Sequence, residues 1–184
     1  MGKKISTQIL TLMALCIVLN IVGGHLALYL HLVIYLDTIG TILSAALLGP
    51  VAALIVGFLT ALINGLTGDL FSIYYMPSQL IVALVAGVMF RRISIQNKKS
   101  LWWLAFIISL PATIVSTVIT VILFHGITSS GSSSLVQIMS GFGMNQALAV
   151  FLVQVGTDYI DRLIGIYIVA VIYIIMKKRM MIHR

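Results

Sequence analysis

The sequence predicts an all-α integral membrane protein: a single domain over residues 1–184 with six transmembrane helices and both termini in the cytoplasm. Three observations support this fold class: the composition, the lengths of the apolar runs and the positions of the basic residues. The chain is 61% hydrophobic and 8% charged, and its mean hydropathy is +1.17. A soluble domain is about half apolar and about a quarter charged, so no soluble packing could bury this much apolar surface in so short a chain.

The first three helices are expected at roughly residues 5–24, 36–48 and 51–67. A spanning helix needs roughly 20 mainly apolar residues, which the first run supplies. No convincing cleavage site follows this run, so we interpret it as an uncleaved helix rather than a signal peptide. The second run is short for a span, which favours either a tilt or an extension into the preceding loop. Gly49 and Pro50 separate it from the third, because proline cannot donate a backbone hydrogen bond and restricts the residue before it.

The remaining helices are expected at roughly residues 77–92, 101–125 and 158–177. Pro77 suits the first turn of the fourth helix, and Pro111 predicts a kink in the fifth. Residues 126–157 begin as a Gly/Ser-rich outer loop and continue as an apolar stretch that predicts a partial or re-entrant helix.

The basic residues set the orientation. With six spans, ten of the eleven fall on one side of the membrane, and that side is cytoplasmic by the positive-inside bias. These ten are Lys3, Lys4, Arg91, Arg92, Lys98, Lys99, Lys177, Lys178, Arg179 and Arg184. Arg162 falls on the outer side.

Several classes of function lack their signatures. The lone cysteine, Cys16, excludes an intramolecular disulfide framework and a Cys-rich metal site, and we expect neither metal nor cofactor. No phosphate-binding loop of the G-x-x-x-x-G-K-[ST] type is present. The cytoplasmic half carries no Asp or Glu, which argues against a self-sufficient proton- or sodium-driven carrier.

All four acidic residues, Asp37, Asp69, Asp158 and Asp161, fall at the outer ends of helices. Ionisable groups cost about 2.5–3.5 kcal/mol at the centre of a membrane helix, so this one-sided polarity predicts a pocket open to the outside. Asp158 and Asp161 lie three positions apart and share a helix face. They either cap the helix and pair with Arg162, or point into the pocket. An acid/base pair is a weaker interpretation, because no nucleophile or third catalytic group accompanies them.

The layout resembles the S components of energy-coupling factor transporters, the substrate-binding membrane subunits of ABC-type vitamin importers of prokaryotes. The resemblance rests on "LDTIGTILSAALLGPVAALIVGFLTALINGLTGD", on "PSQLIVALVAGVMFRR" and on the closing helix "DYIDRLIGIYIVAVIYIIMKKR". It implies docking on a transmembrane coupling subunit and two cytoplasmic ATPase subunits. Docking in that family uses an Ala-x-x-x-Ala pattern on the first helix, where this chain has Ala14 and Val18.

The branch most resembled includes pyridoxine- and hydroxymethylpyrimidine-type transporters. The resemblance therefore implies capture of a small aromatic ring from outside a prokaryotic cell, by a chain that is not itself an enzyme. The substrate-binding residues expected on this basis are Tyr74, Tyr75, Gln79, Asn145, Gln146, Gln154, Asp158 and Asp161. Two alternatives remain open: a structural scaffold of the cell-shape machinery, and a membrane-embedded enzyme that modifies lipid with Asp158 and Asp161 as its acid/base pair.

Overall fold

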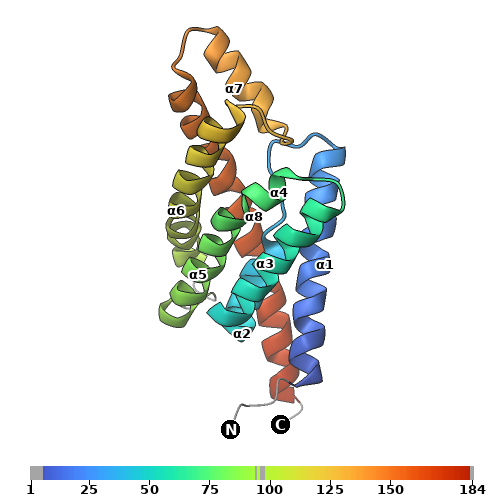
Figure 1. The fold of residues 1–184 in the computed structure, drawn as a ribbon. Coiled ribbons are helices and arrows are strands. Elements are labelled where there is room, and N and C mark those ends of the chain that lie inside the picture. The colour runs from blue at the N-terminus through green and yellow to red at the C-terminus, as the bar shows by residue number, and fades with distance from the viewer. Residues whose placement is uncertain (1–5, 94, 96–97, 183–184) are drawn as a thin grey trace.

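A computed structural model describes residues 6–93, 95 and 98–182 of the chain (Figure 1). These residues form eight α-helices and no strand, which confirms the all-α prediction for the part of the chain that is described. The helices are α1 (Thr7–Tyr29), α2 (Ile39–Leu48), α3 (Pro50–Leu66), α4 (Phe71–Tyr74), α5 (Met76–Arg92), α6 (Lys98–Phe124), α7 (Ser132–Gly141) and α8 (Gln146–Ile182).

The chain runs back and forth between two ends of the bundle (Figure 1). The α1–α2, α3–α4 and α6–α7 connections lie at one end together with α7. The start of α1, the α2–α3 junction, the end of α5 and the end of α8 lie towards the other. We call these the loop end and the termini end. Arg91 and Arg92 occupy the last turn of α5, so they lie at the termini end, as the orientation argument predicts. Lys3, Lys4 and Arg184 lie outside the described residues, as do the side chains of Lys98 and Lys177–Arg179.

Membrane character is supported by length and exposure. By length and composition, two of the described helices, Thr7–Tyr29 and Lys99–Phe124 within α6, can cross a bilayer. Many large apolar side chains point outward, among them Leu10, Trp103 and Val171. A monomeric soluble protein rarely exposes apolar patches this extensive, whereas a bilayer would cover them.

The short helix α2 is the centre of the fold, packed against α1, α3, α5 and α8. Its residues from Ile39 to Ala45 are all buried. Asn20 of α1 holds its start: the Asn20 Oδ1 accepts the Gly40 N–H at 2.6 Å, and the Nδ2 donates to Thr41 Oγ1 at 2.8 Å. A Cβ on Gly40 would lie 1.9 Å from the Cys16 carbonyl oxygen, so only glycine allows this contact. Enclosure by protein explains how a helix too short to span a bilayer can lie inside this bundle.

The largest departures from the expected helices lie in the C-terminal part. The helix expected at 158–177 begins at Gln146 and continues to Ile182, because the apolar residues that precede Asp158 extend it without interruption. The first half of 126–157, expected as a Gly/Ser-rich loop, contains α7. The second half, expected as a partial or re-entrant helix, becomes the start of α8, with a turn at Gly143 (φ 86°) between the two helices. Val136 of α7 packs on Ala149, Val150 and Val153 of α8 and fixes α7 at the loop end.

Candidate ligand-binding cavity

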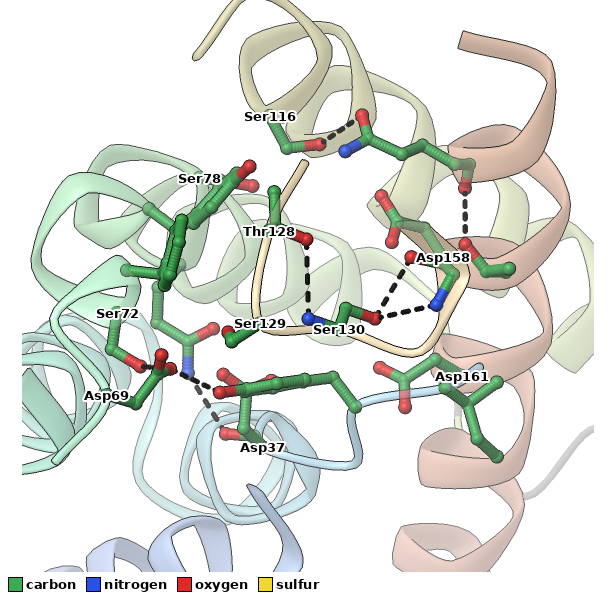
Figure 2. A pocket seen from close by; sticks show the side chains of 18 of the residues that line it. Asp37, Asp69, Ser72, Ser78, Ser116, Thr128, Ser129, Ser130, Asp158 and Asp161 are labelled. Carbon is green, nitrogen blue, oxygen red and sulfur yellow. Dashed lines mark hydrogen bonds between the residues drawn. The ribbon is translucent and has the colours of Figure 1, made fainter. Parts of the chain in front are cut away.

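A cavity of about 120 Å³ lies at the loop end of the bundle. One water molecule needs roughly 10–15 Å³ by this measure, so the cavity has room for several waters or a small solute. Its walls come from the α1–α2 loop, the α3–α4 region, the start of α5, the outer part of α6, the α6–α7 loop and α8. All four aspartates of the chain line it, together with Arg162. Figure 2 shows the four aspartates around a space bordered by serine and threonine side chains.

Asp161 and Arg162 tie α8 to the α1–α2 loop. The Asp161 Oδ1 accepts the backbone N–H of Leu36 at 2.8 Å, and the Oδ2 pairs with the Arg162 guanidinium. Arg162 Nη1 also donates to Thr38 Oγ1 at 3.0 Å. Both charged side chains are buried, with 3% of Asp161 and 7% of Arg162 exposed. The loop residue held in this way, Leu36, has a φ of 55°, a conformation that L-residues adopt rarely and only when the surroundings enforce it.

The carboxylates of Asp158 and Asp37 have fewer partners within the protein than the carboxylate of Asp161. Asp158 accepts a hydrogen bond from Thr113 Oγ1 of α6 at 2.7 Å and lies beside the Ser116 hydroxyl, which leaves part of its acceptor capacity unused. The Asp37 carboxylate accepts no hydrogen bond from any other described residue. Asp37 lies in the α1–α2 loop, outside the helices that form the bundle. Burial raises the pKa of Asp37 to about 7; the Arg162 charge lowers it, and Asp161 and Asp158 raise it further.

Asp69 and the aromatic residues form the opposite wall. Asp69 accepts hydrogen bonds from the Tyr35 hydroxyl and from Ser72 Oγ, the latter at 2.7 Å. Burial, with the hydrogen bond to Asp69 as the second cause, raises the pKa of Tyr35 above its ordinary value. The Tyr75 hydroxyl lies 2.5 Å from Thr120 Oγ1 of α6. With Phe71, these tyrosines bring aromatic surface to a cavity that is otherwise rich in oxygen.

The α6–α7 loop crosses the cavity at Thr128, Ser129 and Ser130 (Figure 2). It is held by internal hydrogen bonds, including Thr128 N–H to Ser133 Oγ at 2.9 Å. It also packs on the α1–α2 loop: a Cβ on Gly131 would lie 2.3 Å from the His31 carbonyl oxygen. The two loops therefore meet beside the cavity and form a cover, which we define as residues 30–38 and 125–131.

Five of the eight expected substrate-binding residues line the cavity: Tyr75, Gln79, Gln154, Asp158 and Asp161. Gln154 uses its amide to join α8 to α6, donating to Thr120 Oγ1 at 2.8 Å and accepting from Thr117 Oγ1 at 2.8 Å. Gln79 donates to the Asp37 carbonyl oxygen at 3.1 Å and to Thr41 Oγ1 at 3.2 Å.

The other three expected residues lie outside the cavity. Tyr74 is 49% exposed and meets Phe124 edge-on, with ring centroids 5.3 Å apart. Asn145 caps α8, since its Oδ1 accepts the Ala147 N–H at 2.9 Å. Gln146 donates to the His125 carbonyl oxygen. Tyr74 differs from Tyr75 because adjacent residues of a helical turn point about 100° apart.

The structure also bears on the expected docking residues, on metal ligands and on Asp161. Ala14 and Val18 lie on the exposed face of α1, with 54% of Val18 exposed. Among the described residues, no three His, Cys, Asp or Glu side chains are placed so that they could hold a metal ion. Asp161 accepts the Leu36 N–H and pairs with Arg162, so both of its carboxylate oxygens have partners within the protein.

The expected site omitted Asp37, Asp69, Arg162, Tyr35 and the serines of the α6–α7 loop. For the two aspartates the signal was present, because all four acids fall at outer helix ends. The Gly/Ser-rich composition around the serines predicts a plain loop and carries no sign that the loop crosses a cavity.

A comparison with models of protein families identifies the family to which the chain belongs. Residues 3–153 match the family described as the 5TMR of 5TMR-LYT, a five-transmembrane receptor family that occurs with LytS-type sensor histidine kinases. No curated protein and no solved structure matches the chain. The matched range contains the helices from α1 to α7 and the start of α8.

This match overturns two expectations. The resemblance to S components of energy-coupling factor transporters is wrong, because the family that covers most of the chain is a receptor family. The function derived from it, uptake of pyridoxine or hydroxymethylpyrimidine, is wrong for the same reason. The expected coupling subunit and ATPase subunits rested on that resemblance and lose their basis with it. The chain belongs to the five-transmembrane receptor family of 5TMR-LYT.

Proposed function

We propose that this chain is the membrane input domain of a prokaryotic signalling system and that it senses a small solute from outside the cell. One observation carries the proposal: a polar cavity lies at the end of the bundle opposite the basic termini end, and the chain's four aspartates all line it. Small-molecule sites are concave and carry a few converging polar groups, as this cavity does. The family supports sensing rather than transport.

The proposal includes six passes of the chain between the two sides of the cell membrane, by α1, α2, α3, α5, α6 and α8. Because α2 is too short to span the bilayer by itself, its pass lies inside the bundle together with the loop that precedes it. The alternation of the chain between the two ends supports this count, and Arg91 and Arg92 at the termini end support a cytoplasmic position for that end. The cavity then opens towards the outer side. A scaffold of the cell-shape machinery would have no use for such a cavity, which disfavours that alternative.

Helix α8 is the element best suited to carry the signal inward. It contributes Gln154, Asp158 and Asp161 to the cavity and continues to Ile182 at the termini end. A helix of 37 residues is about 55 Å long, which exceeds the hydrocarbon thickness of a bilayer. A ligand that bridges Asp158 on α8 and Asp37 on the cover favours one position of α8 against α2 and α6. A ligand can shift the equilibrium between two positions of α8 only if it binds the protein more tightly in one position than in the other.

In this proposal the domain binds and reports but catalyses nothing, and its output passes to a signalling partner such as a histidine kinase. The kinase is proposed from the family alone.

A screen of the purified full chain in nanodiscs tests the proposal. Thermal unfolding is followed with a library of small amines, carboxylates, sugars and amino acids. We expect at least one compound to raise the unfolding temperature of the wild type, since a ligand of the folded state stabilises it by mass action. Hydrogen exchange with that compound should slow in residues 30–38 and at the Asp158 turn.

A matched pair of variants supplies the control. Tyr75→Leu should weaken binding because Tyr75 lines the cavity, whereas Tyr74→Leu should not. Cells that express the chain should change gene expression with the compound and should not accumulate it. Accumulation that depends on the chain would refute sensing in favour of uptake.

A further inference from the structure

We infer that the ligand of this cavity is a small organic ammonium compound, a step that rests on the proposed sensing function and names its ligand class. The argument uses the charges of the cavity, the hydrogen-bonding groups left free in it and its aromatic wall.

The first step is the balance of charge. Four carboxylates and one guanidinium line the cavity. The guanidinium of Arg162 is paired with Asp161 and bonded to Thr38. Asp69 is occupied by two hydroxyl donors, from Tyr35 and Ser72. Asp37 and Asp158 thus remain as carboxylates that form no ion pair with any described residue, in a site partly enclosed by protein. Such a site favours a positive charge, because Coulomb attraction is stronger where the dielectric constant is low.

A second and independent observation comes from Gln79. Its side chain lines the cavity with only 7% of the residue exposed, and its Nε2 is occupied by Asp37 and Thr41. Its Oε1 accepts no hydrogen bond from the described residues. This oxygen is therefore available to accept a hydrogen bond from a solute in the cavity. Asp37, Asp158 and Gln79 offer free acceptors to the cavity, while Arg162 Nε is a buried donor without a partner in the same lining. This excess of acceptors suits a ligand rich in N–H donors.

The third step separates an organic cation from a metal ion. The carboxylates surround the cavity from different elements, and no three acidic or histidine side chains among the described residues are close enough to hold a metal. Tyr35, Phe71 and Tyr75 line the same space. Aromatic faces attract ammonium groups with about 0.5–2 kcal/mol, and they are poor ligands for a hard metal ion. A cavity of about 120 Å³ suits a compound of about ten or fewer non-hydrogen atoms.

Titration calorimetry on the full chain in nanodiscs tests the inference with probes matched in size. Ethanolamine is compared with ethylene glycol, putrescine with butanediol, and acetate and lactate serve as anions. We expect an amine to bind at least about tenfold more tightly than its neutral partner. Binding should also release protons at pH 7, because the pKa of Asp37 is raised to about 7 by burial and a bound cation would favour its ionised form. Three other charged residues also act on Asp37: the Arg162 guanidinium lowers its pKa, and the carboxylates of Asp161 and Asp158 raise it. Repeating the titration in buffers of different ionisation enthalpy measures this release.

Two isosteric variants and one control complete the test. Asp158→Asn and Asp37→Asn should each weaken amine binding about thirtyfold or more, the fold-change that corresponds to the roughly 2 kcal/mol lower limit for breaking a buried charge pair. Asn145→Asp changes net charge by the opposite step outside the cavity and should leave binding unchanged, since Asp caps a helix as well as Asn.

The outcomes separate this inference from the proposed function. If a neutral or anionic probe binds as tightly as the amines, the ammonium class is wrong while the sensor proposal stands. If no amine binds a folded wild-type chain, the inference is likewise overturned, and the wider solute screen then decides the sensor proposal. The comparison within the wild type needs no variant, so a variant that fails to fold does not weaken it.

Discussion

The buried pair of Asp161 and Arg162 offers the sharpest test of the structure. Asp161→Asn keeps an oxygen that can accept the Leu36 N–H but removes the charge that balances Arg162. Removing one partner of a buried ion pair costs about 3–5 kcal/mol. Asp158 and Asp37 remain near Arg162 and compensate in part, so we expect a loss of about 3 kcal/mol, at the lower end of this range.

The double variant Asp161→Asn/Arg162→Met supplies the matched control. Replacing both members of a buried pair by uncharged residues is often neutral, so we expect its stability within about 1 kcal/mol of the wild type. Reversible unfolding in mixed micelles, on addition of a denaturing detergent, measures all the variants. If Asp161→Asn unfolds like the wild type, the tie between α8 and the α1–α2 loop is refuted. It is also refuted if the losses of the single variants Asp161→Asn and Arg162→Met simply add in the double variant, because the side chains then do not act as a pair.

Three further predictions concern the cover and the cavity wall. Burial raises the folded-state pKa of Asp37 to about 7, so its contribution to stability is present below its ordinary pKa and lost as the pH rises through about 7. Asp37→Asn should therefore flatten the fall in unfolding temperature between pH 5 and pH 8, and an unchanged profile would contradict the assignment. Gly131→Ala should separate the two loops and speed hydrogen exchange in residues 30–38, whereas Gly141→Ala, where a Cβ meets nothing within 4 Å, should not; equal exchange in both would show that the loops do not pack as described. Tyr75→Phe should lower stability by about 0.5–1.5 kcal/mol through loss of the bond to Thr120, and thermal unfolding of Tyr74→Phe, whose hydroxyl lies outside the cavity, serves as its control.

Local sequence predicted several elements well. The helix expected at 51–67 is α3 (Pro50–Leu66), and that expected at 77–92 is α5 (Met76–Arg92). Both begin at a proline signal, and proline acts on its own neighbours whatever the rest of the chain does. The junction before Gln146 was less predictable, because residues 126–157 are apolar enough for a helix and rich enough in Gly and Ser for a loop.

The family was misassigned for a related reason. The motifs behind the assignment are short apolar segments that mark helix junctions and outer-end acids. Several kinds of membrane protein can share such a layout, because bilayer thickness and the cost of buried charge constrain all of them alike. The match over residues 3–153 uses the whole pattern and distinguishes a receptor from an importer subunit.

The sequence by itself determined that this chain is a helical membrane protein, which side its cations favour and that its acids gather at the opposite end. These are consequences of hydropathy and charge, which act residue by residue. Only the tertiary structure decided the division of the four aspartates into two that are held by other residues and two that stay open to the cavity. Asp161 accepts the N–H of Leu36, a residue far away in the chain, and Asp69 binds Tyr35, while Asp37 and Asp158 stay open to the cavity. That division depends on which loops pack together across the bundle, and no local pattern records such long-range contacts.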